Sequence, residues 1–400
     1  LSALALSLGD CRNEENIIVN IESHGREDIF ENIDITNTVG WFTTQYPLLL
    51  HTVKDADIGS QIKSIKEQCR RIPRNGIGYG VWRYITQPEN IDFYDPYISF
   101  NYFGEIDKSI YDFEKWSFDF ENSGESVSES NVQKKLLLDI NGWQANNEII
   151  FYFSYSEKVF SEDNITAIIE CFVKYLEKIA VHCSNQKNVE LTSSDYGFYK
   201  LSQEEFEEII SAYNDYTVQD IYPVAPLQTG FIYNALKNPE ADHYFTQMSF
   251  DLVGDVDLNV YLQAWQRTVD ELDILRTAFD WRHKEFAQIV VKSVELPVNK
   301  YDISDQLNED EAFENIRTME KKQKIDLSVP CQTRIAVVTK KYGQITILLS
   351  QHHIIMDGWS LPLLFEHVKQ NYLELKDIGD NIHRDILQYG KYIKEIVSNN

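Results

Sequence analysis

Gln351–Ser360 reads QHHIIMDGWS and directly follows a short apolar run, residues 343–350 (GQITILLS). Such a run, rich in β-branched residues, is typical of a buried strand. A strand that ends in a polar cluster followed by a glycine is a common place for a functional site. Neighbouring side chains of an extended segment point to opposite faces. We therefore expect His352 and His353 to act separately, one facing a cavity and the other packing or bonding to the backbone.

Composition restricts the classes of protein to consider. The chain has 400 residues, 43% of them hydrophobic, and a formal net charge of −26. At roughly 150 residues per domain, the length predicts two or three domains. The acidity disfavours a nucleic-acid surface and would repel anionic membranes. No apolar run is as long as a membrane-spanning helix, which needs about 18 residues.

Cysteine usage indicates an intracellular protein. The five cysteines are scattered and form no CxxC pair, which predicts reduced thiols in the cytoplasm and neither a disulfide framework nor a zinc site. The two histidines also have no third ligand nearby in sequence, so we expect no metal. The start, LSALALSLGD, lacks the basic region of a signal peptide. It is expected to be a helix entered part-way, as in a fragment of a longer protein.

The first half contains one candidate site. Residues 16–22 (NIIVNIE) alternate as in a strand, and the strand ends in Glu22-Ser23-His24-Gly25-Arg26-Glu27. A carboxylate, an imidazole and a guanidinium next to a turn-forming glycine form either a functional site or a solvated charged turn. These residues alone leave both interpretations open. Farther along, residues 164–182 have the apolar spacing of an amphipathic helix.

The second half is predicted to alternate strands and helices. A helix capped by Ser202 is followed by a short linker, residues 211–218. Strands are then expected at 247–253 and 334–338, and helices at 228–236, 258–272 and 361–375. A buried Asp357 would need a partner. We expect that partner to be Arg334 or Arg276, and the sequence does not decide between them.

The full HHxxxDG pattern with WS behind it resembles the signature of the condensation domains of nonribosomal peptide synthetases. More widely, it resembles that of chloramphenicol-acetyltransferase-like acyltransferases. Two upstream segments resemble further condensation motifs: 220–230 (DIYPVAPLQTG) and 275–279 (LRTAF). The match departs at Glu271 and Leu272, where a basic residue and a histidine are more usual.

Residues 1–210 resemble the C-terminal half of an epimerization domain of such a synthetase. Five segments carry this resemblance: 39–43 (VGWFT) leading into 46–48 (YPL), 76–80 (GIGYG), 98–104 (ISFNYFG), 139–143 (DINGW) and the strand-like 149–155. The GxGxG at 76–80 lacks the spacing, the preceding strand and the following helix of a dinucleotide site.

The resemblance implies an α/β fold with two chloramphenicol-acetyltransferase-like lobes, each a mixed β-sheet packed with helices. Residues 1–210 would be the C-terminal lobe of an epimerization domain, residues 211–218 a linker, and residues 219–400 the N-terminal lobe of a condensation domain. Each active site would then be incomplete in this chain.

The resemblance also implies the roles of the site residues. His353 would occupy the catalytic position for peptide-bond formation, as a general base or as a hydrogen-bonding positioner. His352 and Asp357 would hold its geometry, and Gly358 would let the substrate approach the backbone. Glu22 would be one of the acid/base groups of epimerization. Five further residues would line the substrate: Asn101, Tyr102, His24, Trp359 and Ser360.

The implied reactions are L-to-D epimerization of a carrier-bound thioester and its condensation, as a D-configured donor, with an L-configured acceptor. No cofactor would bind directly, because carrier domains would present phosphopantetheine thioesters. Other partners would be the missing lobes and adjacent adenylation domains. Two alternatives remain open: a stand-alone acyltransferase that uses acyl-coenzyme A, and a non-catalytic module that docks carrier proteins. The position of HHxxxDG near the end of the chain opposes the first, and the intact Glu22, His353 and Asp357 oppose the second.

Overall fold

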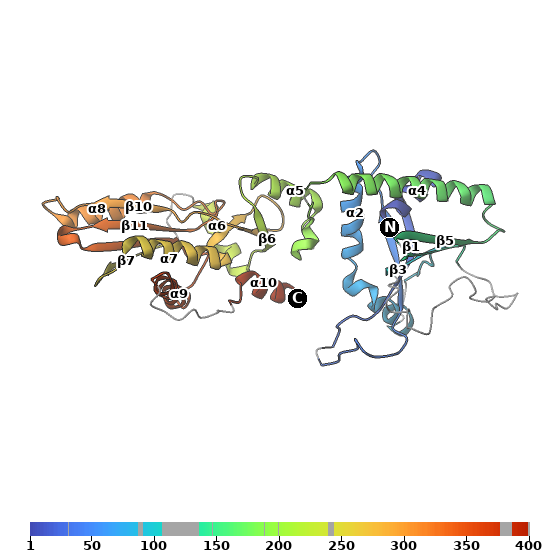
Figure 1. Ribbon diagram of the computed structural model, residues 1–400, viewed down its shortest axis with the longest axis horizontal. Coiled ribbons are helices and arrows are strands. Elements are labelled where there is room, and N and C mark those ends of the chain that lie inside the picture. Colours follow the sequence, from blue (N-terminus) through green and yellow to red (C-terminus); the bar gives the residue numbers. More distant parts are fainter. Residues whose placement is uncertain are drawn as a thin grey trace. The chain divides into compact units, whose positions relative to one another are not determined.

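The computed structural model describes residues 1–30, 32–86, 91–105, 136–145, 147–187, 189–198, 200–238, 244–376 and 386–398. The chain divides into two compact units, Leu1–Leu191 and Thr192–Asn400 (Figure 1). No helix in these described ranges is long and apolar enough to cross a membrane.

The division falls earlier than the predicted lobe boundary at residue 210. Helix α5 (Gln203–Ala212) begins at Ser202, as predicted, but its buried Phe206 and Ile209 belong to the core of the second unit. The predicted linker, residues 211–218, is also not a free connection. Tyr213 is buried in the same core and donates a hydrogen bond from its hydroxyl to the carbonyl of Ser328, at 3.0 Å. Apolar packing therefore assigns residues 192–218 to the second unit.

In the first unit, five strands of the described residues form one mixed sheet in the order β2-β1-β3-β4-β5. β1 and β3 run parallel, as do β3 and β4, and the two outer pairs are antiparallel. The elements of this unit are α1 (Ser2–Arg12), β1 (Asn16–Ser23), β2 (Thr44–His51), α2 (Ile58–Arg70), η1 (Pro73–Gly76), α3 (Gly78–Gly80), η2 (Val81–Thr86), β3 (Ile98–Glu105), β4 (Leu138–Ala145), β5 (Glu148–Tyr155) and α4 (Glu162–Asn185).

One face of this sheet is covered by helices. Alternate residues of the strands, such as Val19, Leu48 and Ile140, form a single core with side chains of α1, α2 and α4. The period of two places the intervening residues on the opposite face. That face carries polar side chains, among them Glu22 and Asn101, and it provides the first candidate site.

The second unit contains two sheets in its described part. The elements are η4 (Ser193–Tyr196), α5, β6 (Val218–Pro223), α6 (Pro226–Lys237), β7 (Phe245–Leu252), α7 (Leu258–Glu271), η5 (Asp273–Arg276), β8 (Thr277–Asp280), β9 (Ala287–Val291), β10 (Val298–Asp302), α8 (Glu309–Lys322), β11 (Thr333–Thr339), η6 (Lys341–Gly343), β12 (Ile345–His352), α9 (Ser360–Leu375) and α10 (Tyr389–Ser398).

A four-stranded mixed sheet, β10-β11-β12-β7, lies between two layers of helices. Val338 and Leu348 face α8 on one side, whereas Ile347 and Leu349 face the core formed with α6, α7 and α9 on the other. The described part of this unit also contains a separate three-stranded antiparallel sheet, β6-β9-β8. The predicted α/β class with mixed sheets packed by helices is confirmed, although this unit has two sheets where one was expected.

The strand before HHxxxDG is central, as predicted. β12 pairs with β11 on one side and β7 on the other, and seven of its eight residues are buried. A strand covered on both faces reads as a continuous apolar run, which is how residues 345–349 read in the sequence. Pairing on both sides therefore holds the last residues of β12 in a fixed position.

Candidate functional site

His352 is the packed member of the histidine pair. It ends β12, is only 6% exposed, and its Nδ1 accepts a hydrogen bond from the backbone N–H of Ile354, at 3.1 Å. Burial, assisted by the neighbouring His353, lowers the pKa of His352 to about 4. His352 is therefore neutral at pH 7 and supports the turn that follows the strand.

His353 is the member that faces a cavity. Together with Asp357 and Gly358 it lines a hollow of about 130 Å³. Its ring lies nearly parallel to that of Phe231 on α6, with centroids 6.3 Å apart. The structure thus places one histidine in the core and the other at a cavity, as expected for neighbouring residues that point to opposite faces. The remaining lining residues, which sequence reasoning did not identify, are Thr246, Gln247, Met248, Leu349, Gln351, Met356 and Leu361.

The turn after His353 fixes the form of its imidazole. Nδ1 of His353 lies 2.6 Å from the carbonyl oxygen of Met356. A carbonyl oxygen only accepts hydrogen bonds, so Nδ1 carries the hydrogen, and in the neutral ring the lone pair is on Nε2. The backbone N–H of His353 donates to the carbonyl of Tyr244, at 2.7 Å, which holds the residue against β7. The ring is therefore anchored through Nδ1, and its lone pair is on Nε2.

The expected ion pair of Asp357 is wrong. Asp357 is exposed, and its Oδ1 accepts hydrogen bonds from the backbone N–H of Ser360, at 2.9 Å, and from the Ser360 hydroxyl, at 2.8 Å. These bonds lower the pKa of Asp357. An exposed carboxylate needs no buried cation, and this one instead satisfies an amide at the start of α9.

Both arginines considered for that pair bind other groups. Arg334 donates from Nε to Glu320 Oε2, at 2.7 Å, and from Nη2 to the carbonyl of Gln323, at 2.9 Å. Arg276 is 3% exposed and donates from Nη2 to Asp273 Oδ1, at 2.5 Å. Each arginine thus stabilises the scaffold at a distance from the histidine turn.

Three other predicted residues of the turn have different placements. Nothing lies within 4 Å of the position that a Cβ at Gly358 would take, so this side of the backbone is open. Trp359 is 88% exposed, and Ser360 serves as the partner of Asp357. Neither of these two residues lines the cavity beside His353. The predicted substrate contacts of Trp359 and Ser360 are therefore absent from this hollow.

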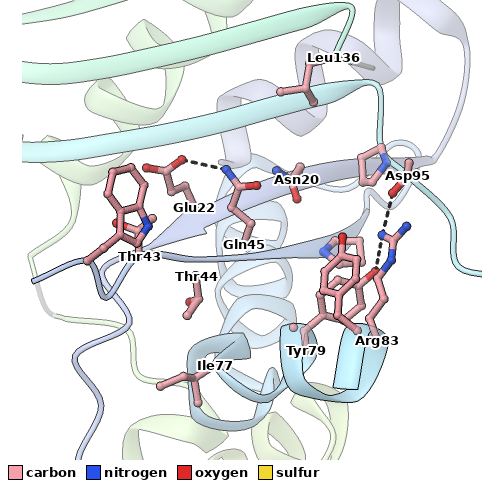
Figure 2. A pocket seen from close by; sticks show the side chains of 15 residues that line it. Asn20, Glu22, Thr43, Thr44, Gln45, Ile77, Tyr79, Arg83, Asp95 and Leu136 are labelled. Atoms are coloured by element: carbon pink, nitrogen blue, oxygen red, sulfur yellow. Dashed lines mark hydrogen bonds and ion pairs between the residues drawn. The ribbon is translucent and has the colours of Figure 1, made fainter. Parts of the chain in front are cut away.

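A second, larger cavity lies on the open face of the sheet in the first unit. It measures about 520 Å³ and receives Glu22 from the end of β1 (Figure 2). Fourteen further residues line it: Asn20, Trp41, Thr43, Thr44, Gln45, Pro47, Ile77, Tyr79, Gly80, Arg83, Tyr84, Asp95, Pro96 and Leu136.

Two side-chain amides hold the carboxylate of Glu22. Asn101 on β3 donates from Nδ2 to Oε1, and Gln45 on β2 donates from Nε2 to Oε2, each at 3.1 Å. Sequence reasoning brought Glu22 and Asn101 together but missed Gln45. The available signal was the alternation of β2, in which Tyr46 and Leu48 enter the core. Gln45 must then point to the face that carries Glu22.

Three residues predicted to line the substrate are not among those that line this cavity: Asn101, Tyr102 and His24. Asn101 nevertheless contacts Glu22. Tyr102 follows Asn101 on β3, so its ring points to the opposite face, where it stacks on Phe151 at 6.2 Å between centroids. His24 has a largely exposed side chain, accepts a hydrogen bond from the backbone N–H of Arg26, and lies 3.6 Å from a carboxylate oxygen of Glu27. Its role here is to shape the turn after β1.

The other end of the cavity carries an ion pair that the sequence did not reveal. Arg83 donates from Nη1 to Asp95, at 2.7 Å, and to the hydroxyl of Tyr79, at 3.2 Å. Figure 2 shows these three side chains together, away from Glu22 and Gln45. The glycine-rich segment before them has a packing role. Gly76 has φ +76°, and a Cβ there would overlap the ring of Tyr46.

Comparisons with known proteins show the family to which the chain belongs. The Condensation domain family matches residues 1–200 and 218–399. Bacitracin synthase 3 of Bacillus licheniformis is 31% identical over 400 residues, which cover 98% of this chain and 6% of that protein. Gramicidin S synthase 1 of Brevibacillus brevis is 35% identical over 225 residues, which cover 54% of this chain and 20% of that protein. The chain thus spans a fifth or less of these relatives.

A solved structure is similar to part of the chain. The epimerization domain from the third module of tyrocidine synthetase B is 35% identical, with a TM-score of 0.42, over 46% of this chain and 41% of that one. The family match covers nearly all of both units. The chain therefore belongs to the Condensation domain family, as its resemblance to the condensation-type domains of nonribosomal peptide synthetases predicted.

Proposed function

We propose that the chain supplies parts of two consecutive active sites of a nonribosomal peptide synthetase. The first unit would contribute to epimerization of a carrier-bound aminoacyl or peptidyl thioester, and the second to peptide-bond formation. The observation that carries the proposal is that each unit presents one acid/base side chain, held by fixed hydrogen bonds, to a cavity: Glu22 in the first and His353 in the second.

The second site suits the attack of an amine on a thioester. The nitrogen forms a bond to the carbonyl carbon, the carbon–sulfur bond breaks, and one proton moves from the nitrogen to the departing thiolate. The free Nε2 of His353 would accept that proton or hold the amine in place, since Nδ1 is occupied by the Met356 carbonyl. His352, neutral and buried, would keep the turn in position.

The first site suits exchange of the proton at Cα. Glu22 would remove this proton or return it, while a second group on the other side of the carbon performs the opposite transfer. Two amide donors hold the carboxylate in place, one on each oxygen. The complementary half of each site, including this second group, would come from elsewhere in the synthetase.

The order of the two units implies the stereochemistry of the joint reaction. The epimerized thioester would serve as a D-configured donor for an L-configured acceptor, and both would be presented by carrier domains on phosphopantetheine. Adenylation domains that load those carriers would be further partners. The 400-residue chain alone is expected to be nearly inactive in both reactions.

The test uses the intact synthetase that contains this chain, with its flanking carriers loaded with aminoacyl phosphopantetheine. Dipeptide formation and deuterium exchange at Cα are followed separately. His353→Ala should abolish dipeptide formation and spare exchange. Glu22→Gln should abolish exchange and spare dipeptide formation when the donor is supplied already in the D configuration. His24→Ala serves as the matched control, because His24 lies close to Glu22 in sequence but outside the cavity.

The outcomes distinguish the competing functions. Retention of both reactions in both variants would contradict the proposal and favour a docking module. Acyl transfer from acyl-coenzyme A by the isolated chain would favour the stand-alone acyltransferase. Loss of both reactions in the His24→Ala control would show that the first unit tolerates no change at this turn, and Glu22→Asp would then replace Glu22→Gln as the diagnostic variant.

A further inference from the structure

Gln45 occupies the place directly across the β1–β2 ladder from Glu22. The two residues are register partners in the antiparallel pair, and the amide of Gln45 donates to Glu22 Oε2 at 3.1 Å. Cross-strand partners on one face of an antiparallel pair have Cβ atoms about 5 Å apart, which is a suitable spacing for this contact. Gln45 itself also lines the cavity.

The other oxygen of the carboxylate is held from the opposite side. Asn101, on the neighbouring strand β3, donates to Oε1 at 3.1 Å. The carboxylate therefore has one amide donor on each oxygen and cannot rotate without losing both bonds. Each oxygen keeps lone pairs for a further contact, because a carboxylate has about four acceptor positions.

We propose that Gln45 is a positioning residue, which orients Glu22 for proton transfer at Cα. This inference rests on the proposed epimerization. In that step the Cα–H bond breaks, the proton moves to an oxygen of Glu22, and the electron pair passes into the thioester carbonyl as an enolate. The hydrogen bond from the amide of Gln45 fixes one oxygen of Glu22, which leaves the carboxylate in a defined orientation toward the substrate.

The role differs from that of a residue that merely fills space. Loss of orientation should lower kcat with little effect on KM, because Gln45 acts through Glu22. A purely structural role would lower the amount of folded protein without changing kcat per folded molecule.

The experiment compares two variants in the intact synthetase. Gln45→Leu removes the donor, and Gln45→Glu keeps the shape but sets a second carboxylate against Glu22. Deuterium exchange at Cα is measured over a range of substrate concentrations, so that kcat and KM are obtained separately. We expect Gln45→Leu to lower kcat about ten-fold with little change in KM. Gln45→Glu should lower kcat farther, because like charges directly across an antiparallel pair repel and would displace Glu22.

The matched control is Gln344→Leu. Gln344 also donates from its amide to a carboxylate, Asp251 Oδ2 at 3.0 Å, but it lies in the second unit. This variant should leave kcat and KM of exchange unchanged. If the wild-type protein exchanges the Cα proton but Gln45→Leu and Gln45→Glu retain its kcat, the positioning role is wrong. If the wild-type protein shows no exchange, the proposed epimerization itself fails.

Discussion

The imidazole of His353 is oriented by the backbone carbonyl of Met356, 2.6 Å from its Nδ1, and by no carboxylate. In catalytic triads a buried carboxylate both orients the histidine and stabilises its protonated form. A carbonyl supplies the orientation with only a partial negative charge. The nearby Asp357, which could have played the triad role, is bonded to Ser360 at the start of α9. The site thus selects a tautomer through a backbone carbonyl.

This arrangement allows the two roles left open for His353 to be separated. His353→Gln puts an amide near the place of Nε2, so it can position an amine but cannot accept a proton. If proton acceptance is required, peptide formation in the intact synthetase should fall by about 100-fold. His353→Asn, whose amide reaches only the place of Nδ1, is the matched variant and should be at least as impaired. Near-normal turnover by His353→Gln would show that His353 only positions the amine.

The local sequence pattern was enough to predict the strand β12 and the opposite orientations of the two histidines that follow it. The alternation of neighbouring side chains predicted that one histidine packs and the other faces a cavity, and the structure assigns these places to His352 and His353 in turn. The same rule separates Asn101 from Tyr102, and applying it consistently would have removed Tyr102 from the predicted site.

The partners of Arg334 and Asp357 could not be found in this way. Arg334 binds Glu320 on α8, a contact that depends on how the helix crosses the sheet. Asp357 was expected to be buried, but it lies at an exposed helix start. The Glu22–Gln45 contact likewise depends on the register of β1 and β2, which the sequence leaves open. These partners depend on tertiary packing and strand register, which spacing along the chain does not specify.

Arg334 should be essential for the stability of the second unit. Its partner Glu320 has a side chain only 1% exposed. Arg334→Met would leave this buried carboxylate without the arginine, with hydrogen bonds from the neutral Asn299 and Tyr301. We expect the free energy of unfolding to fall by about 3 kcal/mol or more, measured by urea unfolding. Arg317→Met is the control. Arg317 forms a more exposed pair with Glu314, and its loss should cost below about 1 kcal/mol.

Asp357 should stabilise the start of α9 by a small free energy. Asp357→Ala removes the acceptor for the amide of Ser360 and should lower the free energy of unfolding by about 1 kcal/mol. Asp357→Asn keeps an acceptor oxygen and should cost less. A loss of about 3–5 kcal/mol in urea unfolding of Asp357→Asn would instead match a buried ion pair and contradict the geometry.

Gly25 should tolerate no side chain. It has φ +64°, and a Cβ there would overlap the carbonyl oxygen of Phe42. Gly25→Ala should therefore lower the free energy of unfolding of the first unit by about 3 kcal/mol or more. Hydrogen exchange with mass spectrometry reports this unit separately. Gly78→Ala, where nothing lies within 4 Å of the added Cβ, is the control and should be close to neutral.

The buried neutral state of His352 should make the second unit sensitive to acid. Its pKa in the folded protein is about 4, below the ordinary value of 6.5. Between these two values the unfolded chain binds a proton that the folded chain excludes. Stability from this residue is therefore complete above about pH 7 and is lost as the pH falls toward 4. The loss at pH 5 should be about 2 kcal/mol.

Many carboxylates also titrate over this range, so wild-type unfolding alone cannot isolate the effect. His352→Asn keeps an acceptor near the place of Nδ1 for the amide of Ile354 but has no group that titrates. The difference in unfolding free energy between wild type and His352→Asn, measured in urea, should therefore shrink by about 2 kcal/mol between pH 7 and pH 5. A difference independent of pH would mean that His352 is charged, or solvated, in the folded protein.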